Sequence, residues 1–277
     1  MSDFLKALHD CDFEAADEFL AHGQDVNARI GPWGSTALAA VTGNRGWAAF
    51  DYLLDHGARI DCVDDDGTTL AHYVVSSAGH QGEQSAVAMM RYLIGKGLQI
   101  DRMNSDGYTP LLWAVDAGNL DMTRLLLDSG ADPNARRLGL SMGEGAMEFA
   151  INKRESEADA LVGMLLEHGA ASDGLIRHSK LGVISFLSAA IYARRASVAT
   201  RLMEAQGMPV DSKLEFFDNR TLLQIFSKDI PNRQHVVGAL ERMRGKRALQ
   251  EISDLMEQAA AAPASTRASR SYAGMGL

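Results

Sequence analysis

Apolar residues gather along this chain in short blocks, and each block ends at a glycine. The closing segments are FLAHG at Gly23, LLDHG at Gly57, LIGKG at Gly97, LLDSG at Gly130, LLEHG at Gly169 and, more weakly, LMEAQG at Gly207. The steps between these glycines are 34, 40, 33, 39 and 38 residues. A period of this size indicates stacked repeats, each burying its apolar face against its neighbours rather than in one central core.

The repeat is clearest from Asn104 to Arg136. Asp106-Gly107 predicts a turn, and Thr109-Pro110 predicts a helix start, because threonine caps free amides and proline suits the first turn. Two apolar stripes at helical spacing follow, separated by Gly118-Asn119; they comprise Leu111, Ala114 and Val115, then Leu120, Thr123, Leu126 and Leu127. Gly130 stands where a left-handed C-cap is expected. Each unit is therefore predicted to be two antiparallel helices with a short hairpin-like connection.

This unit resembles an ankyrin repeat, whose pattern D-x-x-G-x-T-P-L-H-x-A-A is followed by a second helix and then H-G-A-D-V-N-A. Parts of it recur at Gly34 to Leu38, His56 to Ala58, Gly67 to His72 and Gln24 to Arg29. The threonine position recurs as Thr36, Thr69, Thr109, Gly145, Ser185 and Thr221, so the match weakens towards the C-terminus. The resemblance implies an all-α ankyrin-repeat solenoid of helix-turn-helix units with short β-hairpin-like connections, in which His72 bridges backbone groups.

We therefore expect a repeat array over residues 1–245, with a shortened N-terminal cap unit (1–29) and about six repeats (30–245). Residues 246–262 are predicted to form a C-terminal capping helix. Residues 263–277 are small, polar and aperiodic, which predicts a disordered tail. Two segments depart from the pattern. Residues 76–85 are expected to form a surface loop inserted between two helices, and Arg136 to Met147 is irregular and glycine-rich.

Charge is uneven along the chain. Residues 1–180 carry 14 Lys and Arg against 27 Asp and Glu, a balance of −13, and the remainder carries +4, for a formal net charge of −9. This asymmetry indicates either a partner with a basic face or an acidic surface that keeps the protein soluble. Cys11 and Cys62 alone make no disulfide framework, and neither an apolar run of 18 residues nor a signal-peptide pattern occurs. We expect a cytoplasmic monomer without a membrane span.

Motifs that could carry chemistry lack their structural context. Gly139-Leu-Ser-Met-Gly143 matches G-x-S-x-G, but no strand-forming segment precedes it. Asp61 to Gly67 fails as a calcium loop, since Cys62 and Tyr73 occupy the first and twelfth ligand positions. The histidines have no metal-ligand spacing; His22, His56 and His168 instead fall in last helical turns, where imidazole can meet free carbonyls. No catalytic, cofactor or metal site is expected.

A basic cluster follows the repeats, comprising Arg242, Arg244, Lys246, Arg247, Arg267 and Arg270. No aromatic residues are interleaved with it, so a solvated helix face is favoured over nucleic-acid binding.

The resemblance also implies where a partner binds, because ankyrin repeats use the concave face formed by their hairpin tips and inner helices. The corresponding residues here are Arg29, Ile30, Trp33, Asp64, Asp65, Met103, Asn104, Tyr108, Trp113, Arg136 and Arg137. Trp33 replaces the usual turn aspartate and is the main anchor candidate, with packing against Pro32 as the alternative. Trp113 is either core or part of the inner face. Asp64 and Asp65 are expected to be exposed charges that speed association.

The function expected is a non-enzymatic module for protein–protein interaction, with an inhibitor or immunity-type role as one form of it. Two alternatives remain open. One is a secreted bacterial effector that targets a host protein through the array, and the other is an enzyme with a site hidden in the irregular repeats 137–215. The alanine-rich composition and the preference for Arg over Lys favour a bacterial source.

Overall fold

A computed structural model of the protein describes residues 2–42, 47–81, 83–137, 144–178 and 182–208, with two short strands further on. Contacts divide the chain into two units, Met1–Gly207 and Met208–Leu277. In the second unit, β3 (Lys213–Leu214) pairs antiparallel with β4 (Arg220–Thr221). The predicted capping helix (246–262), tail (263–277), basic cluster and G-x-S-x-G motif (139–143) lie outside the described residues.

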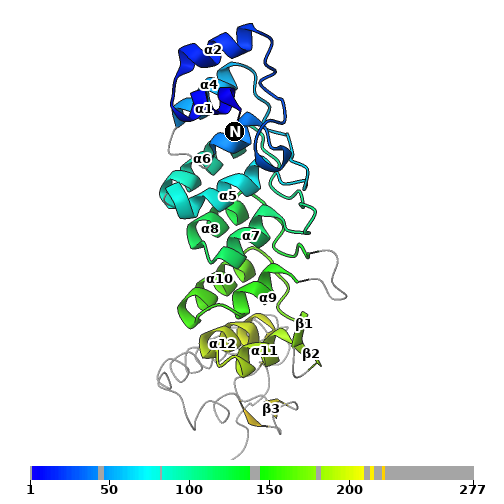
Figure 1. Ribbon diagram of the computed structural model, residues 1–277. Coiled ribbons are helices and arrows are strands. Elements are labelled where there is room, and N and C mark those ends of the chain that lie inside the picture. The colour runs from blue at the N-terminus through cyan, green and yellow to red at the C-terminus, as the bar shows by residue number, and fades with distance from the viewer. Residues whose placement is uncertain are drawn as a thin grey trace, which may run out of the picture. The chain divides into compact units, whose positions relative to one another are not determined.

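The first unit consists of helix pairs that follow one another in chain order (Figure 1). The pairs are α1 (Asp3–His9) with α2 (Phe13–Ala21), α3 (Ala37–Val41) with α4 (Trp47–Asp55), α5 (Leu70–Gln81) with α6 (Glu83–Gly95), α7 (Pro110–Ala117) with α8 (Leu120–Asp128), α9 (Ala146–Ile151) with α10 (Glu155–Glu167), and α11 (Phe186–Tyr192) with α12 (Ala196–Ala205). The first helices of the pairs, here called the inner helices, contact one another in sequence from α1 to α11. Helices α6, α8, α10 and α12 do the same. The apolar faces are thus buried between neighbouring repeats, as the period predicted.

Local signals in the sequence place the helix ends. The Thr109 hydroxyl accepts a hydrogen bond from Leu112 N at 3.2 Å, and Thr36 and Ser185 cap α3 and α11 in the same way. The glycines that close the repeats all have positive φ, between 63° and 93°. A left-handed residue ends a helix at low cost only when it lacks a side chain, so these glycines fix the C-terminal boundaries.

The predicted hairpin-like connections are also present. Isolated antiparallel bridges join Arg29 to Thr36, Val63 to Thr69 and Arg136 to Gly145. The connection before α11 is longer, and β1 (Leu175–His178) pairs there with β2 (Gly182–Ser185) in antiparallel register. Helices α3, α5, α9 and α11 therefore begin directly after a hairpin, and Asn104 N donates to Tyr108 O at 2.9 Å in the hairpin before α7, so these hairpins adjoin the inner helices.

The core prediction for the best-formed repeat is confirmed, since Leu126 is 0% exposed and Leu111, Ala114 and Val115 are buried. The surface loop predicted for residues 76–85 is wrong. Helices α5 and α6 continue through most of this segment and have 12 and 13 residues, whereas α7 and α8 have 8 and 9. The physical reason is that α5 and α6 pack against each other and bury Ser77 and Ala86, while Ser76 and Gln84 stay exposed on the same helices.

Candidate interaction surface

His72 links two repeats through its imidazole ring. Its Nδ1 accepts from Thr69 N at 3.2 Å and contacts Thr69 Oγ1 at 2.8 Å, while Nε2 donates to Tyr108 O in the next hairpin at 2.9 Å. The predicted bridging role of this histidine is confirmed. Burial lowers the pKa of His72, because a fully enclosed ring loses the solvation that favours its charged form.

Three further histidines cap helix ends as predicted. The Nδ1 atoms of His22, His56 and His168 donate to the carbonyls of Glu18, Tyr52 and Met164 at 2.6–2.8 Å. Each of these carbonyls also accepts from the backbone N of the same histidine, so the ring adds a second bond at the helix end. In the described parts of the chain, no group of three or more His, Cys, Asp or Glu side chains converges as metal ligands would.

Successive hairpins are joined at one equivalent position. Three residues before the cap residues Thr36, Thr69 and Thr109 stand Trp33, Asp66 and Asp106, here called the tip row. Each carbonyl of the tip row accepts a hydrogen bond from the following hairpin, from Asp65 N at 3.1 Å, Ser105 N at 2.7 Å and Arg137 Nε at 2.8 Å. All three side chains of the tip row are exposed, so backbone contacts hold the row while its side chains face solvent.

Trp33 is the most exposed large apolar residue of the described chain, at 72%. The alternative that its ring packs against Pro32 does not fit this exposure. Its φ of 54° lies in the left-handed region, which costs a residue with a side chain roughly 1–2 kcal/mol. An exposed ring held at such a backbone conformation contributes little to packing, and this is consistent with a role outside folding.

A second row runs along the inner helices. Tyr73, Trp113 and Phe149 each lie four residues after the cap position, on α5, α7 and α9, and each is half-buried; we call them the aromatic row. Tyr108 connects the last two, with its ring centroid 6.2 Å from that of Trp113 and stacked at 5.8 Å on Phe149. Trp113 also lies 5.4 Å from the His72 ring. The row is thus held rigidly but remains partly open to solvent.

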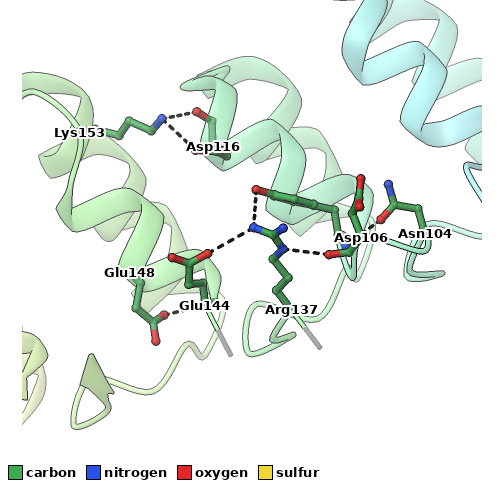
Figure 2. Close-up of polar contacts among 9 residues, drawn as sticks. Asn104, Asp106, Asp116, Arg137, Glu144, Glu148 and Lys153 are labelled. Atoms are coloured by element: carbon green, nitrogen blue, oxygen red, sulfur yellow. Dashed lines mark hydrogen bonds and ion pairs between the residues drawn. The ribbon is translucent and has the colours of Figure 1, made fainter. Parts of the chain in front are cut away.

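Ion pairs flank the aromatic row on both sides. Figure 2 shows the Arg137 guanidinium between Asp106 and Glu144, with Lys153 directed at Asp116. Arg137 Cζ lies 4.4 Å from the centroid of the Tyr108 ring, and Nη1 donates to Tyr108 Oη at 3.1 Å. Arg137 therefore stacks on an aromatic ring and ties the hairpin of residues 104–108 to its own hairpin, which the Arg136–Gly145 bridge closes.

Several residues predicted to bind a partner also hold the hairpins together. The prediction that Asp64 is an exposed charge is wrong: it is buried, and its carboxylate accepts from Asp66 N, Thr68 N and Tyr73 Oη at 2.7–2.9 Å. Two bonds to amides of its own turn and one to a tyrosine draw this carboxylate inward.

Arginines at the hairpins also have structural partners. Arg136 forms an ion pair with the buried Glu148, which accepts from Gly145 N at 2.9 Å. Glu148 thereby forms the N3-to-N-cap half of a capping box at the start of α9, where Gly145 has no side chain to form the other half. Arg29 pairs with Asp65 at 2.5 Å and donates to Val63 O at 2.9 Å.

The other predicted residues divide into support and surface. Asn104 Oδ1 accepts from Tyr108 N at 2.9 Å and shapes the hairpin that precedes α7. Ile30 and Met103 are half-buried. Tyr73, Phe149, Asp66 and Asp106 were not predicted, although their equivalence to Trp113 or Trp33 in the repeat register was a signal that could have found them.

Residues 52–137 match the family model described as ankyrin repeats (3 copies). An ankyrin repeat-containing protein of Treponema pallidum is 34% identical over 119 residues, which span 43% of this chain and 36% of that protein. The 26S proteasome non-ATPase regulatory subunit 10 of Dictyostelium discoideum is 31% identical over 83 residues, or 30% of this chain and 33% of that protein. The chain thus spans about a third of the length of these relatives.

Among solved structures, an ankyrin repeat domain from Acinetobacter baumannii AYE matches with a TM-score of 0.59 at 23% identity, covering 73% of this chain and 97% of that one. The predicted fold class is confirmed, and the protein has the ankyrin-repeat fold. Ankyrin repeats are generally modules of protein–protein interaction. Within the described residues, no helix is both long and apolar enough to cross a membrane.

Proposed function

We propose that this protein is a non-enzymatic binding module that holds a partner protein on the surface formed by its hairpin tips and inner helices. The observation that supports this most directly is the aromatic row. Tyr73, Trp113 and Phe149 occupy one equivalent position in three successive repeats, and none of them is fully buried. Tyrosine and tryptophan dominate the binding energy of protein interfaces, because they bury a large area at a small entropic cost.

The surrounding residues support the same interpretation. Each member of the row has a fixed neighbour: Tyr73 Oη donates to Asp64, Trp113 contacts the His72 ring, and Phe149 stacks on Tyr108. Preorganised side chains lose little conformational entropy on binding, which raises affinity for a given contact area. Charged groups flank the rings, so the arrangement has an apolar centre and a polar rim, as protein interfaces do.

Site-specific photo-crosslinking tests this proposal. A photoreactive phenylalanine derivative replaces Ser76, which is exposed on α5 one turn beyond Tyr73, or Arg124, which is exposed on α8. In extracts of the cells that make the protein, the probe at position 76 is expected to label a defined partner and the probe at position 124 is not. Mass spectrometry then identifies the partner for measurements with purified proteins.

Affinity measurements on that partner provide the decisive step. Trp113→Ala is expected to weaken binding by about tenfold or more, as truncation of an interface anchor does. Tyr92→Ala is the matched control, because Tyr92 is a partly exposed aromatic residue (37%) on α6, outside the inner helices. Circular dichroism and urea unfolding confirm that each variant is folded. Equal losses for both variants, or labelling only from position 124, would show that the partner binds elsewhere.

A further inference from the structure

The carboxylates of the tip row form no ion pair within the described part of the chain, although the Arg137 guanidinium lies against the Asp106 carbonyl. Other acidic residues of this surface have cations: Asp65 pairs with Arg29, Asp116 with Lys153 and Glu144 with Arg137. Asp66 and Asp106 are exposed, and no ion pair among the described residues includes either of them.

The sequence of these two hairpins strengthens the point. Residues 63–68 and 102–108 contain four aspartates and a single basic residue, Arg102. One of the four, Asp64, is buried and bonded, which leaves the exposed carboxylates at the tips. The tip row therefore attracts cationic groups at two points in adjacent repeats.

The distance between adjacent repeats restricts how a partner can reach both points. Packed helices lie roughly 8–10 Å apart, and equivalent residues of neighbouring repeats share that spacing. A polyproline II helix rises about 3.1 Å per residue with three residues per turn, so residues i and i+3 lie on one side about 9 Å apart. A β-strand directs residues i and i+3 to opposite faces and does not match.

The aromatic row also fits a partner segment in polyproline II conformation. Polyproline II segments bind where aromatic side chains line a surface, because proline rings pack flat against aromatic faces. Tyr73, Trp113 and Phe149 recur at the repeat spacing and are each partly exposed, with Tyr108 stacked on one face of the Phe149 ring. Arg137 over the Tyr108 ring shows that this surface also accommodates a guanidinium.

We infer that the surface takes a proline-rich, basic segment of its partner in polyproline II conformation. Lysine or arginine residues three apart lie over Asp66 and Asp106, and prolines between them pack on the aromatic row. Trp33 precedes Asp66 in the tip row. The partner residue three positions before the cation over Asp66 therefore faces Trp33 and is apolar. This inference rests on the proposed function and specifies the partner's chemistry.

Synthetic peptides test the inference with the full chain. The probe is a fluorescent peptide of the pattern Leu-Pro-Pro-Lys-Pro-Pro-Lys-Pro-Pro, and its control has the same composition with the two lysines adjacent. Fluorescence anisotropy is expected to show the spaced peptide binding about tenfold more tightly than the adjacent one. Asp66→Asn with Asp106→Asn should reduce its affinity by about tenfold, with the larger loss at low salt. The control double variant, Asp51→Asn with Asp55→Asn on α4, removes the same charge from exposed positions. It should change the affinity for the spaced peptide less than twofold.

The outcomes separate the two proposals. Equal binding of both peptides, or equal loss in both double variants, would mean general electrostatic attraction and overturn the inference. If the spaced peptide does not bind while crosslinking from position 76 and the Trp113→Ala loss both hold, the proposed function stands and the inference about polyproline II is wrong. If those two measurements also fail, the proposed function itself is wrong.

Discussion

His72 offers the sharpest test of how neighbouring repeats are coupled. The ring is 0% exposed, and it satisfies Thr69 N within its own repeat and Tyr108 O in the next. His72→Ala leaves the buried Thr69 N without a partner, at about 1–3 kcal/mol, removes one of the two bonds to Tyr108 O, which keeps Asn104 N, and also leaves a cavity. We expect the free energy of unfolding to fall by about 3–5 kcal/mol at pH 7.5.

The pH dependence follows from the direction of the pKa shift. Because Nδ1 accepts from a backbone amide, the fold requires a neutral ring, and burial lowers the pKa of His72 below its ordinary value of 6.5. Above pH 6.5 neither the folded nor the unfolded state binds the proton, so the contribution of His72 is complete. As the pH falls below 6.5 the unfolded state takes up a proton that the folded state resists, and stability is lost.

Urea unfolding at pH 7.5 and pH 5.5 measures this linkage. The destabilisation caused by His72→Ala should be smaller at pH 5.5, because the wild type has by then lost part of what the histidine contributes. His22→Ala is the control, since His22 is exposed and bonds only to a carbonyl of its own helix. A His72→Ala effect that is equal or larger at pH 5.5 would refute the reasoning.

Three further predictions concern stability. Leu126→Ala should lower the free energy of unfolding by about 2–5 kcal/mol, and Leu175→Ala, at a 49% exposed position, by far less; equal shifts in the urea midpoint would contradict the assigned core. Asn134→Asp should cost about 1–2 kcal/mol, because Nδ2 donates to Gly169 O at 3.1 Å in the next repeat, whereas exposed Asn152→Asp should be nearly neutral in the same titration. Trp33→Gly should be more stable than Trp33→Ala by up to about 1 kcal/mol in thermal unfolding, because only glycine relieves the positive φ; the reverse order would show that the backbone is unstrained there.

The candidate surface was only partly predictable from the sequence. Trp33, Tyr108, Trp113 and Arg137 could be placed on it because the repeat pattern identifies hairpin tips and inner helices. Asp64 could not be separated from its exposed neighbours, since three consecutive aspartates look alike until the turn brings one carboxylate against two amides and Tyr73 Oη.

The structural role of Arg136 could not be predicted from the sequence either. Its partner Glu148 is buried at the start of α9, where it accepts from Gly145 N. Such roles depend on which atoms a turn brings together.

The sequence by itself determined the period, the helix pairs, their caps and the glycines that end them. These features depend on residues within one turn of each other, so propensity and spacing are sufficient to predict them. Tertiary structure decided how repeats are coupled and which side chains remain on the surface. The contacts from Arg29 to Asp65, His72 to Tyr108 and Asn134 to Gly169 join residues about one repeat apart. Residues 76–81 and 83–85 are helical as well, and the packing of α5 against α6 that accompanies this is not written in local sequence.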